Sequence, residues 1–211
     1  MRFVAISDTH CRHRNIHLPK GDVLLHAGDI SYKGNKEEVK DFLQWFSQQN
    51  FTYKIFIAGN HDFFMENAGI AEIKNLIPEN VIYLNDSGIA IEGISIWGSP
   101  VTPWFFNWAF NRHRGEEIQK HWNLIPMDTH VLLTHGPVLG IHDTVINGRH
   151  VGCADLLGKV KEIKPKVHIC GHIHEGYGEI KKFGIKFINA SVLNETYELV
   201  NKPVVFDLAS P

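Results

Sequence analysis

The chain has 211 residues, of which 44% are hydrophobic and 21% are charged, which is enough apolar material for the core of one domain. The net charge is −2, so no basic surface for nucleic acid is indicated. Three cysteines without a CxxC pair argue against a disulfide framework or a thiolate zinc site. No apolar run approaches the ~20 residues of a membrane span. We therefore expect a single cytoplasmic domain over residues 1–211 with no membrane partner.

Five short apolar runs, rich in β-branched residues, each end directly at a polar motif. The runs are residues 3–7 before Asp8-Thr9-His10, 23–27 before Gly28-Asp29, 54–58 before Gly59-Asn60-His61-Asp62, 130–133 before Thr134-His135-Gly136, and 167–170 before Gly171-His172-Ile173-His174. Runs of this length and composition predict buried strands that are apolar on both faces.

Helical spacing occurs between these strands. It is clearest over residues 36–49, where Val39, Phe42, Leu43 and Phe46 recur at intervals of three and four. Weaker helices are predicted over 67–76, 114–122 and 153–163. Alternating strands and helices indicate an α/β sheet, in which ligand sites collect beyond the carboxyl ends of the strands.

The pattern changes after residue 80, where most strands follow one another without helices between them. Strands are predicted at 81–84, 89–91, 94–97, 185–188 and 204–206, with hairpin turns at 86–88 and 92–93. A second, partly antiparallel sheet is therefore expected.

The side chains in the motifs are those that hold divalent metals. The candidate ligands are Asp8, His10, Asp29, Asn60, His135, His172 and His174. In an extended backbone, residues two apart lie ~6.5 Å apart on one side, which suits two metals about 3.5–4 Å apart. The mixed donors fit Mn, Fe or Zn, with a carboxylate, best Asp29, as the bridge. Two divalent ions against two carboxylates leave the site at −2 + 4 = +2, so we expect an anionic ligand such as a small phosphate ester.

Other residues near the motifs are assigned roles in the reaction. His61 is predicted to protonate the leaving oxygen, and Asp62 to orient the His61 ring or raise its basicity. Arg149 and His150, ahead of a helix expected to start near residue 152, are the candidate substrate contacts. The aromatic segment 104–110 either walls a pocket or fills the core, and core packing is favoured.

The order DxH, GD, GNH(D/E), H, GHxH resembles the calcineurin-like metallophosphoesterases, and the resemblance runs from Asp8 to His174. It implies a four-layered αββα sandwich of two mixed sheets, with His61 near the leaving group. It also implies one metal held by Asp8, His10, Asp29 and His174, and a second held by Asp29, Asn60, His135 and His172.

A narrower resemblance rests on residues 97–100, 104–110, 134–137, 151–153 and 171–178, which are similar to the metallophosphoesterase-domain-containing proteins of animals and their bacterial relatives. This subgroup implies phosphodiesterase activity, with cyclic nucleotides among the substrates. Some of its animal members have Gly where this chain has His172. The presence of that ligand here leads us to expect a complete metal pair.

The predicted function is a dinuclear metal-dependent phosphodiesterase, in which a metal-bridging hydroxide attacks and His61 acts as general acid. A phosphomonoesterase that uses the same metals is the alternative, because the ligands do not distinguish the two. A scaffold or binding protein on a degenerate phosphoesterase fold is less favoured, since every family ligand is present. The sequence leaves the oligomeric state, the metal and the physiological substrate open.

Overall fold

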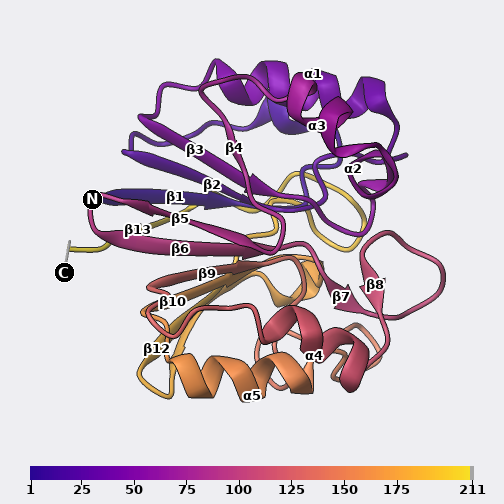
Figure 1. Ribbon diagram of the computed structural model, residues 1–211, viewed down its shortest axis with the longest axis vertical. Coiled ribbons are helices and arrows are strands. Elements are labelled where there is room, and N and C mark those ends of the chain that lie inside the picture. The colour runs from indigo at the N-terminus through magenta and orange to yellow at the C-terminus, as the bar shows by residue number, and fades with distance from the viewer. Residues whose placement is uncertain (210–211) are drawn as a thin grey trace.

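Two β-sheets lie face to face, and helices cover the outer face of each (Figure 1). The computed structural model describes residues 1–209. The αββα order of layers and the mixed character of both sheets agree with the expected fold.

The first sheet has the strand order β13-β1-β2-β3-β4. Strands β1 to β4 run parallel, and β13 is antiparallel to β1 at the edge. Their bounds are β1 (Arg2–Ile6), β2 (Val23–Ala27), β3 (Tyr53–Ile57), β4 (Ile82–Tyr83) and β13 (Val204–Asp207).

The second sheet has the order β11-β12-β10-β9-β6-β5. Its four inner strands are parallel, and the edge strands β11 and β5 are antiparallel to their neighbours. The bounds are β5 (Ser87–Ile91), β6 (Ile94–Ser99), β9 (Val131–Thr134), β10 (Val167–Cys170), β11 (Gly178–Lys182) and β12 (Ile185–Asn189). Strands β7 (Thr102–Pro103) and β8 (Asn111–Arg112) form a separate pair.

The division of strands between the sheets differs from the expected one. Strands β9 and β10, which carry two of the five motifs, belong to the second sheet, whereas the late strands β4 and β13 complete the first. The apolar runs alone do not distinguish these partners, because every one of them is buried on both faces.

Three helices cover the first sheet and two cover the second (Figure 1). They are α1 (Lys36–Ser47), α2 (Phe63–Asn67) and α3 (Ile70–Leu76), and then α4 (Glu116–Trp122) and α5 (Ala154–Ile163). The Asn35 side chain caps α1 by accepting from the Glu38 N–H. The helix expected over 67–76 corresponds to α3, which begins later, at Ile70, because the backbone is extended at Ala68 and Gly69; α2 precedes it and was not predicted.

Three apolar cores fill the spaces between the layers. Alternate residues of β1 contribute to two different cores, one on each face of the first sheet. Phe3 and Ala5 pack between the sheets, whereas Val4 and Ile6 pack against α1. The third core lies between the second sheet and α4 and α5, with the fully buried Trp122 in it. These cores fix how the two sheets pack on each other and on the helices.

The β5–β6 hairpin turns at Glu92 and Gly93, which have φ of 48° and 79°. Positive φ at both positions is the geometry that matches the twist of a two-residue hairpin, so this turn was correctly expected. The hairpin expected at 86–88 does not form, because β4 pairs with β3 in the first sheet and β5 with β6 in the second; the chain instead bends at residues 85–86, where Asp86 has φ of 44°. Among residues 1–209, no helix has the length and apolar character needed to cross a membrane.

Candidate metal centre

The five motifs meet at one end of the sandwich, although they come from two sheets. Strands β1, β2 and β3 deliver three of them, and β9 and β10 deliver the other two. The His172 N–H donates to both carboxylate oxygens of Asp8, at 3.0 and 3.1 Å. The His135 Nδ1–H donates to the Ala27 carbonyl at 2.9 Å. These bonds join the carboxyl ends of the two sheets into one site.

The backbone at the site is left-handed rather than extended. The φ angles are 54° at Asp8, 39° at His10, 56° at Asp29 and 67° at His172. The expectation that Asp8 and His10 project together from an extended backbone is therefore wrong. Such angles are strained in non-glycine residues and occur where the surrounding structure holds them in place. They turn the side chains back across the ends of the sheets.

The predicted ligands form overlapping clusters, in each of which the ligand atoms lie within 4.8 Å of one another. The clusters are Asp8 with His10 and His174, His10 with Asp29 and His61, and Asp29 with His135 and His172. The seventh predicted ligand, Asn60, has its Oδ1 2.8 Å from His135 Nε2. The structure thus brings all seven predicted ligands together and adds His61 beside them.

Asp29 occupies the centre of this arrangement. Its Oδ2 lies 3.6 Å from His10 Nε2 and 3.3 Å from His135 Nε2. Its Oδ1 accepts the backbone N–H of His61 at 2.8 Å. One carboxylate oxygen therefore faces one histidine of each outer cluster, which is the position that a bridging ligand requires.

Backbone carbonyls set the orientation of the imidazole rings. His10 Nδ1 bonds to the Ser31 carbonyl at 3.1 Å, and His174 Nδ1 bonds to the Asn194 carbonyl at 2.8 Å. Together with the bond from His135 to Ala27, these contacts place a proton on Nδ1 and leave Nε2 facing the cluster. The His10 Nε2 is buried and has no hydrogen-bond partner among the described residues. A buried ring nitrogen left in this state fits a metal ligand.

Motif glycines make room for the carboxylates. A Cβ on Gly59 would collide with Asp29 Oδ1, and a Cβ on Gly171 would collide with Asp8 Oδ2. Larger residues at these two positions would push the acids out of the site. The glycines of the GNH and GHxH motifs are thus explained by packing against the ligands.

The pKa values of the buried acids and histidines show which charge the site favours. Burial raises the pKa of Asp8, but His174 and His135 lower it further, so the pKa lies well below its usual range. Burial lowers the pKa of His135 and His174, yet the hydrogen bonds and charges of Asp29 and Asp8 raise both to about 9. Both shifts mean that the buried acids favour positive charge beside them. Divalent ions would supply that charge, so the residues present fit a metal centre.

Asp62 was expected to orient the His61 ring, but it does not bond to it. The His61 Nδ1–H donates to the Tyr32 carbonyl at 2.9 Å instead. The buried Asp62 carboxylate accepts the backbone N–H groups of Gly59 at 2.7 Å and Ser31 at 3.0 Å. It therefore ties the loop after β2 to the loop after β3. Burial and the charge of Asp29 raise its pKa to about 6.

The aromatic segment 104–110 contacts the site at two places. The Trp108 ring centroid lies 4.4 Å from that of His61, and the Phe105 centroid lies 5.1 Å from that of His172. Ala109 and Phe110 are buried, but Trp104 is 49% and Phe106 76% exposed, so the favoured prediction of core packing is wrong for most of the segment. The segment is mainly a wall along the site. No local sequence pattern distinguishes the ring that packs on His61 from its neighbours.

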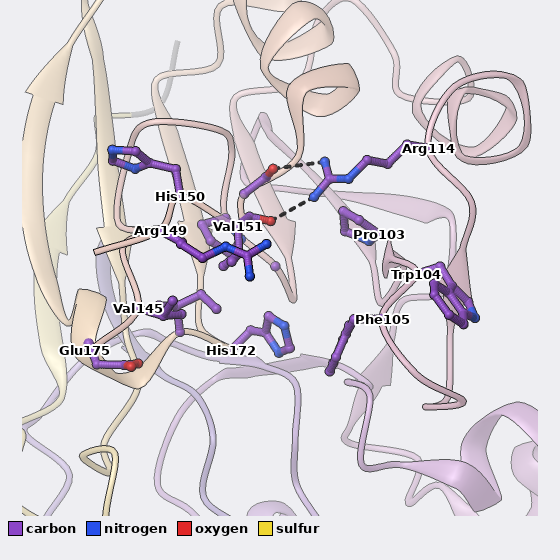
Figure 2. A pocket seen from close by; sticks show the side chains of 14 residues that line it. Pro103, Trp104, Phe105, Arg114, Val145, Arg149, His150, Val151, His172 and Glu175 are labelled. Atoms are coloured by element: carbon purple, nitrogen blue, oxygen red, sulfur yellow. Dashed lines mark hydrogen bonds between the residues drawn. The ribbon is translucent and has the colours of Figure 1, made fainter. Parts of the chain in front are cut away.

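A pocket of about 450 Å³ opens beside His172 and Phe105 (Figure 2). Both candidate substrate residues line it, but they differ in direction. The Arg149 guanidinium points into the pocket, whereas the His150 ring turns away from His172. His150 Nδ1 bonds to the buried Asp143 carboxylate at 2.8 Å. His150 is therefore anchored to its own loop, and Arg149 is the residue that is free to meet a ligand.

Each sheet supports its ligands with a buried histidine that had no predicted role. His26 Nε2 lies 3.0 Å from Thr9 Oγ1, between Asp8 and His10. His168 Nε2 lies 2.7 Å from Thr134 Oγ1, next to His135. Burial lowers the pKa of both histidines to about 3, so they remain neutral in the folded protein.

Acid should therefore destabilise the metal-free fold. The unfolded chain binds a proton at each of these histidines below its ordinary pKa of about 6.5, and the folded chain does not until pH 3. Between pH 7 and pH 5, each histidine should therefore lower the free energy of unfolding by about 2 kcal/mol. We expect His168→Gln to reduce the pH dependence of the free energy of unfolding by that amount, measured by urea titration with chelator present. The exposed His17→Gln is the control, and an equal effect in both variants would contradict this assignment.

The fold and the site together define a metal-dependent phosphoesterase, because a sandwich of this kind presents carboxylate, imidazole and amide donors around a central acid. Residues 1–176 match the calcineurin-like phosphoesterases. The chain belongs to this family.

Two proteins and one solved structure are similar to this chain. The human metallophosphoesterase domain-containing protein 1 is 42% identical, over all of this chain and 72% of that protein. A protein of Arcobacter nitrofigilis named "Probable glycerophosphodiester phosphodiesterase GpdQ" is 29% identical over 77% of this chain and 60% of its own length. The solved structure of phosphopantetheinyl hydrolase from Mycobacterium tuberculosis has a TM-score of 0.65 at 16% identity, covering 92% of this chain and 90% of that one. This last likeness concerns the fold.

Proposed function

We propose that the chain hydrolyses phosphodiesters with a pair of divalent ions, Mn, Fe or Zn, and that His61 is the general acid. The observation that carries the proposal is the place of Asp29 Oδ2 between His10 Nε2 and His135 Nε2, at 3.6 and 3.3 Å. Asp8, His10, Asp29 and His174 would hold one ion. Asp29, Asn60, His135 and His172 would hold the other.

Charge favours phosphate esters as substrates. The two carboxylates offset two of the four positive charges that a pair of divalent ions would bring, so an anion is attracted. When bound, such ions neutralise charge on phosphoryl oxygens and lower the pKa of water, which activates it for attack on phosphorus. Hydrogen bonds to backbone groups hold five of the ligand side chains in place, those of Asp8, His10, Asp29, His135 and His174.

His61 is placed to deliver a proton to the leaving oxygen. The Nδ1–H is fixed on the Tyr32 carbonyl, and Trp108 packs on one face of the ring. Nε2 is then the atom that holds and releases the catalytic proton. An alkoxide that leaves from a diester gains from such a proton. The name of the Arcobacter relative supports diesters over monoesters.

Two alternatives remain to be separated from this function. A phosphomonoesterase would use the same ligands, and a scaffold protein would have no need of them. The buried, unpartnered His10 Nε2 speaks against a scaffold, because it is a cost to the fold that a ligand would remove.

A substrate panel tests the proposal. The purified protein would be stripped with chelator, reloaded with Mn, Fe or Zn, and assayed on bis(4-nitrophenyl) phosphate, 4-nitrophenyl phosphate, and 2′,3′- and 3′,5′-cyclic nucleotides. We expect diester hydrolysis that disappears on chelation and returns with metal. Faster turnover of the monoester would favour the phosphomonoesterase. If the protein neither binds metal nor hydrolyses any of these esters, the scaffold protein is the function that remains.

A further inference from the structure

The loop that carries Arg149 is held in place by hydrogen bonds. The buried Asp143 carboxylate accepts the N–H groups of Gly140 at 2.9 Å and Gly152 at 3.1 Å, in addition to its bond with His150. Within the loop, the Val145 N–H donates to the Arg149 carbonyl at 3.1 Å. The base of the Arg149 side chain is therefore fixed relative to the site.

A second arginine fastens this loop to the opposite wall of the pocket. The Arg114 guanidinium donates to the carbonyls of Val151 at 2.9 Å and Gly152 at 3.0 Å (Figure 2). Its partners are neutral carbonyls, so its positive charge is not cancelled by an acid. Arg114 positions the loop and also adds to the positive potential of the pocket.

The Arg149 guanidinium itself makes no hydrogen bond or ion pair with any of residues 1–209. One acid lines the same pocket, Glu175, and its Oε1 accepts the Ile146 N–H at 3.0 Å. The pocket therefore holds two cations against one acid beside His172 of the metal centre, and the donors of the Arg149 guanidinium are free. A guanidinium in this state matches a carboxylate or phosphate, which it can bind through two parallel N–H groups.

We propose that Arg149 is a specificity residue, which binds a second anionic group carried by one organic arm of the substrate. The substrate class is then a phosphoric ester that bears a carboxylate or a further phosphate at a distance from the reacting phosphorus. The inference rests on the proposed function, because it assumes that the ester phosphate lies at the metal centre. Phe105, between the pocket and His61, would flank the connecting arm.

Calorimetry with hydrolysis-resistant ligands tests Arg149 without turnover. Alkylphosphonates with three to six carbons would be titrated into the Mn-loaded protein, with and without a terminal carboxylate, and in a third arm with a terminal phosphonate. At the chain length that spans the two sites, we expect the anionic terminus to lower Kd about 10-fold or more, in keeping with one charged hydrogen-bonded pair. The preferred terminus distinguishes a carboxylate from a phosphate substrate.

Two variants complete the experiment. Arg149→Gln should abolish the gain from the terminal anion, whereas Arg12→Gln, which removes an exposed charge outside the pocket, should retain it. No gain at any length, or a gain that survives in Arg149→Gln, would overturn the proposal. A parallel assay on bis(4-nitrophenyl) phosphate separates the two hypotheses. If this diester is not hydrolysed, the proposed phosphodiesterase activity is wrong. The ratio of Kd values with and without the terminal anion tests the anion site independently of turnover.

Discussion

Asp29→Ala should remove most of the activity and at least one of the two proposed metals. Asp29 faces both outer clusters through one oxygen, so no other side chain can compensate for its loss. We expect kcat/KM for bis(4-nitrophenyl) phosphate to fall by about 1,000-fold or more, which corresponds to roughly 4 kcal/mol of transition-state stabilisation. Elemental analysis of the dialysed variant measures the bound metal directly.

Controls separate this effect from a general loss of structure. Asp29 also accepts the His61 N–H, so circular dichroism and thermal unfolding should accompany the metal analysis. Asp29→Asn keeps the shape of the side chain but removes its charge, and we expect it to lose metal as well. Asp128→Ala, at an exposed acid, should behave as wild type. Two metals per chain in Asp29→Ala would refute the bridging role.

His61→Ala should keep both metals and lose proton transfer to the leaving group. Positioned acids contribute about 100-fold to 10,000-fold, and the contribution grows as the leaving group becomes more basic. We therefore expect a small loss with 4-nitrophenyl diesters and a loss of at least about 100-fold with alkyl diesters. A plot of log kcat/KM against leaving-group pKa should be steeper for the variant than for wild type.

The metal content of the same variant decides between two roles for His61. Its ring lies in a cluster with His10 and Asp29, so a ligand role is the competing interpretation. Reduced metal content in His61→Ala, with an equal loss for every leaving group, would favour that role over general acid catalysis. Trp108→Leu should show a weaker form of the general-acid defect, because it removes the ring that holds His61 in place. His17→Ala serves as the control.

Local signals determined where the ligands come from. An apolar run followed by a polar motif identifies a buried strand and its carboxyl end, and both features lie within a few residues of each other. The spacing of Val39, Phe42, Leu43 and Phe46 likewise identified α1, since each of these residues is buried. The same signals predicted seven candidate metal ligands, because the donor chemistry is a property of the side chains alone, and the structure gathers these residues at one place.

Only the tertiary structure decided how these pieces meet. The bond between His172 and Asp8 joins residues 164 apart, and that between His135 and Ala27 joins residues 108 apart. Such contacts depend on how two sheets pack, which no local pattern contains. For the same reason the sequence placed Asp62 on the His61 ring, where the structure has the Tyr32 carbonyl.

The Arg149 loop shows the same division most clearly. From the sequence by itself, Arg149 and His150 are equivalent polar neighbours in a loop before a helix, and both were assigned to the substrate. The fold gives His150 a buried partner in Asp143 and leaves the Arg149 guanidinium free in the pocket. The sequence thus determined which chemical groups are available and on which strands. The packing of distant segments decided which of those groups are already satisfied and which remain to bind a ligand.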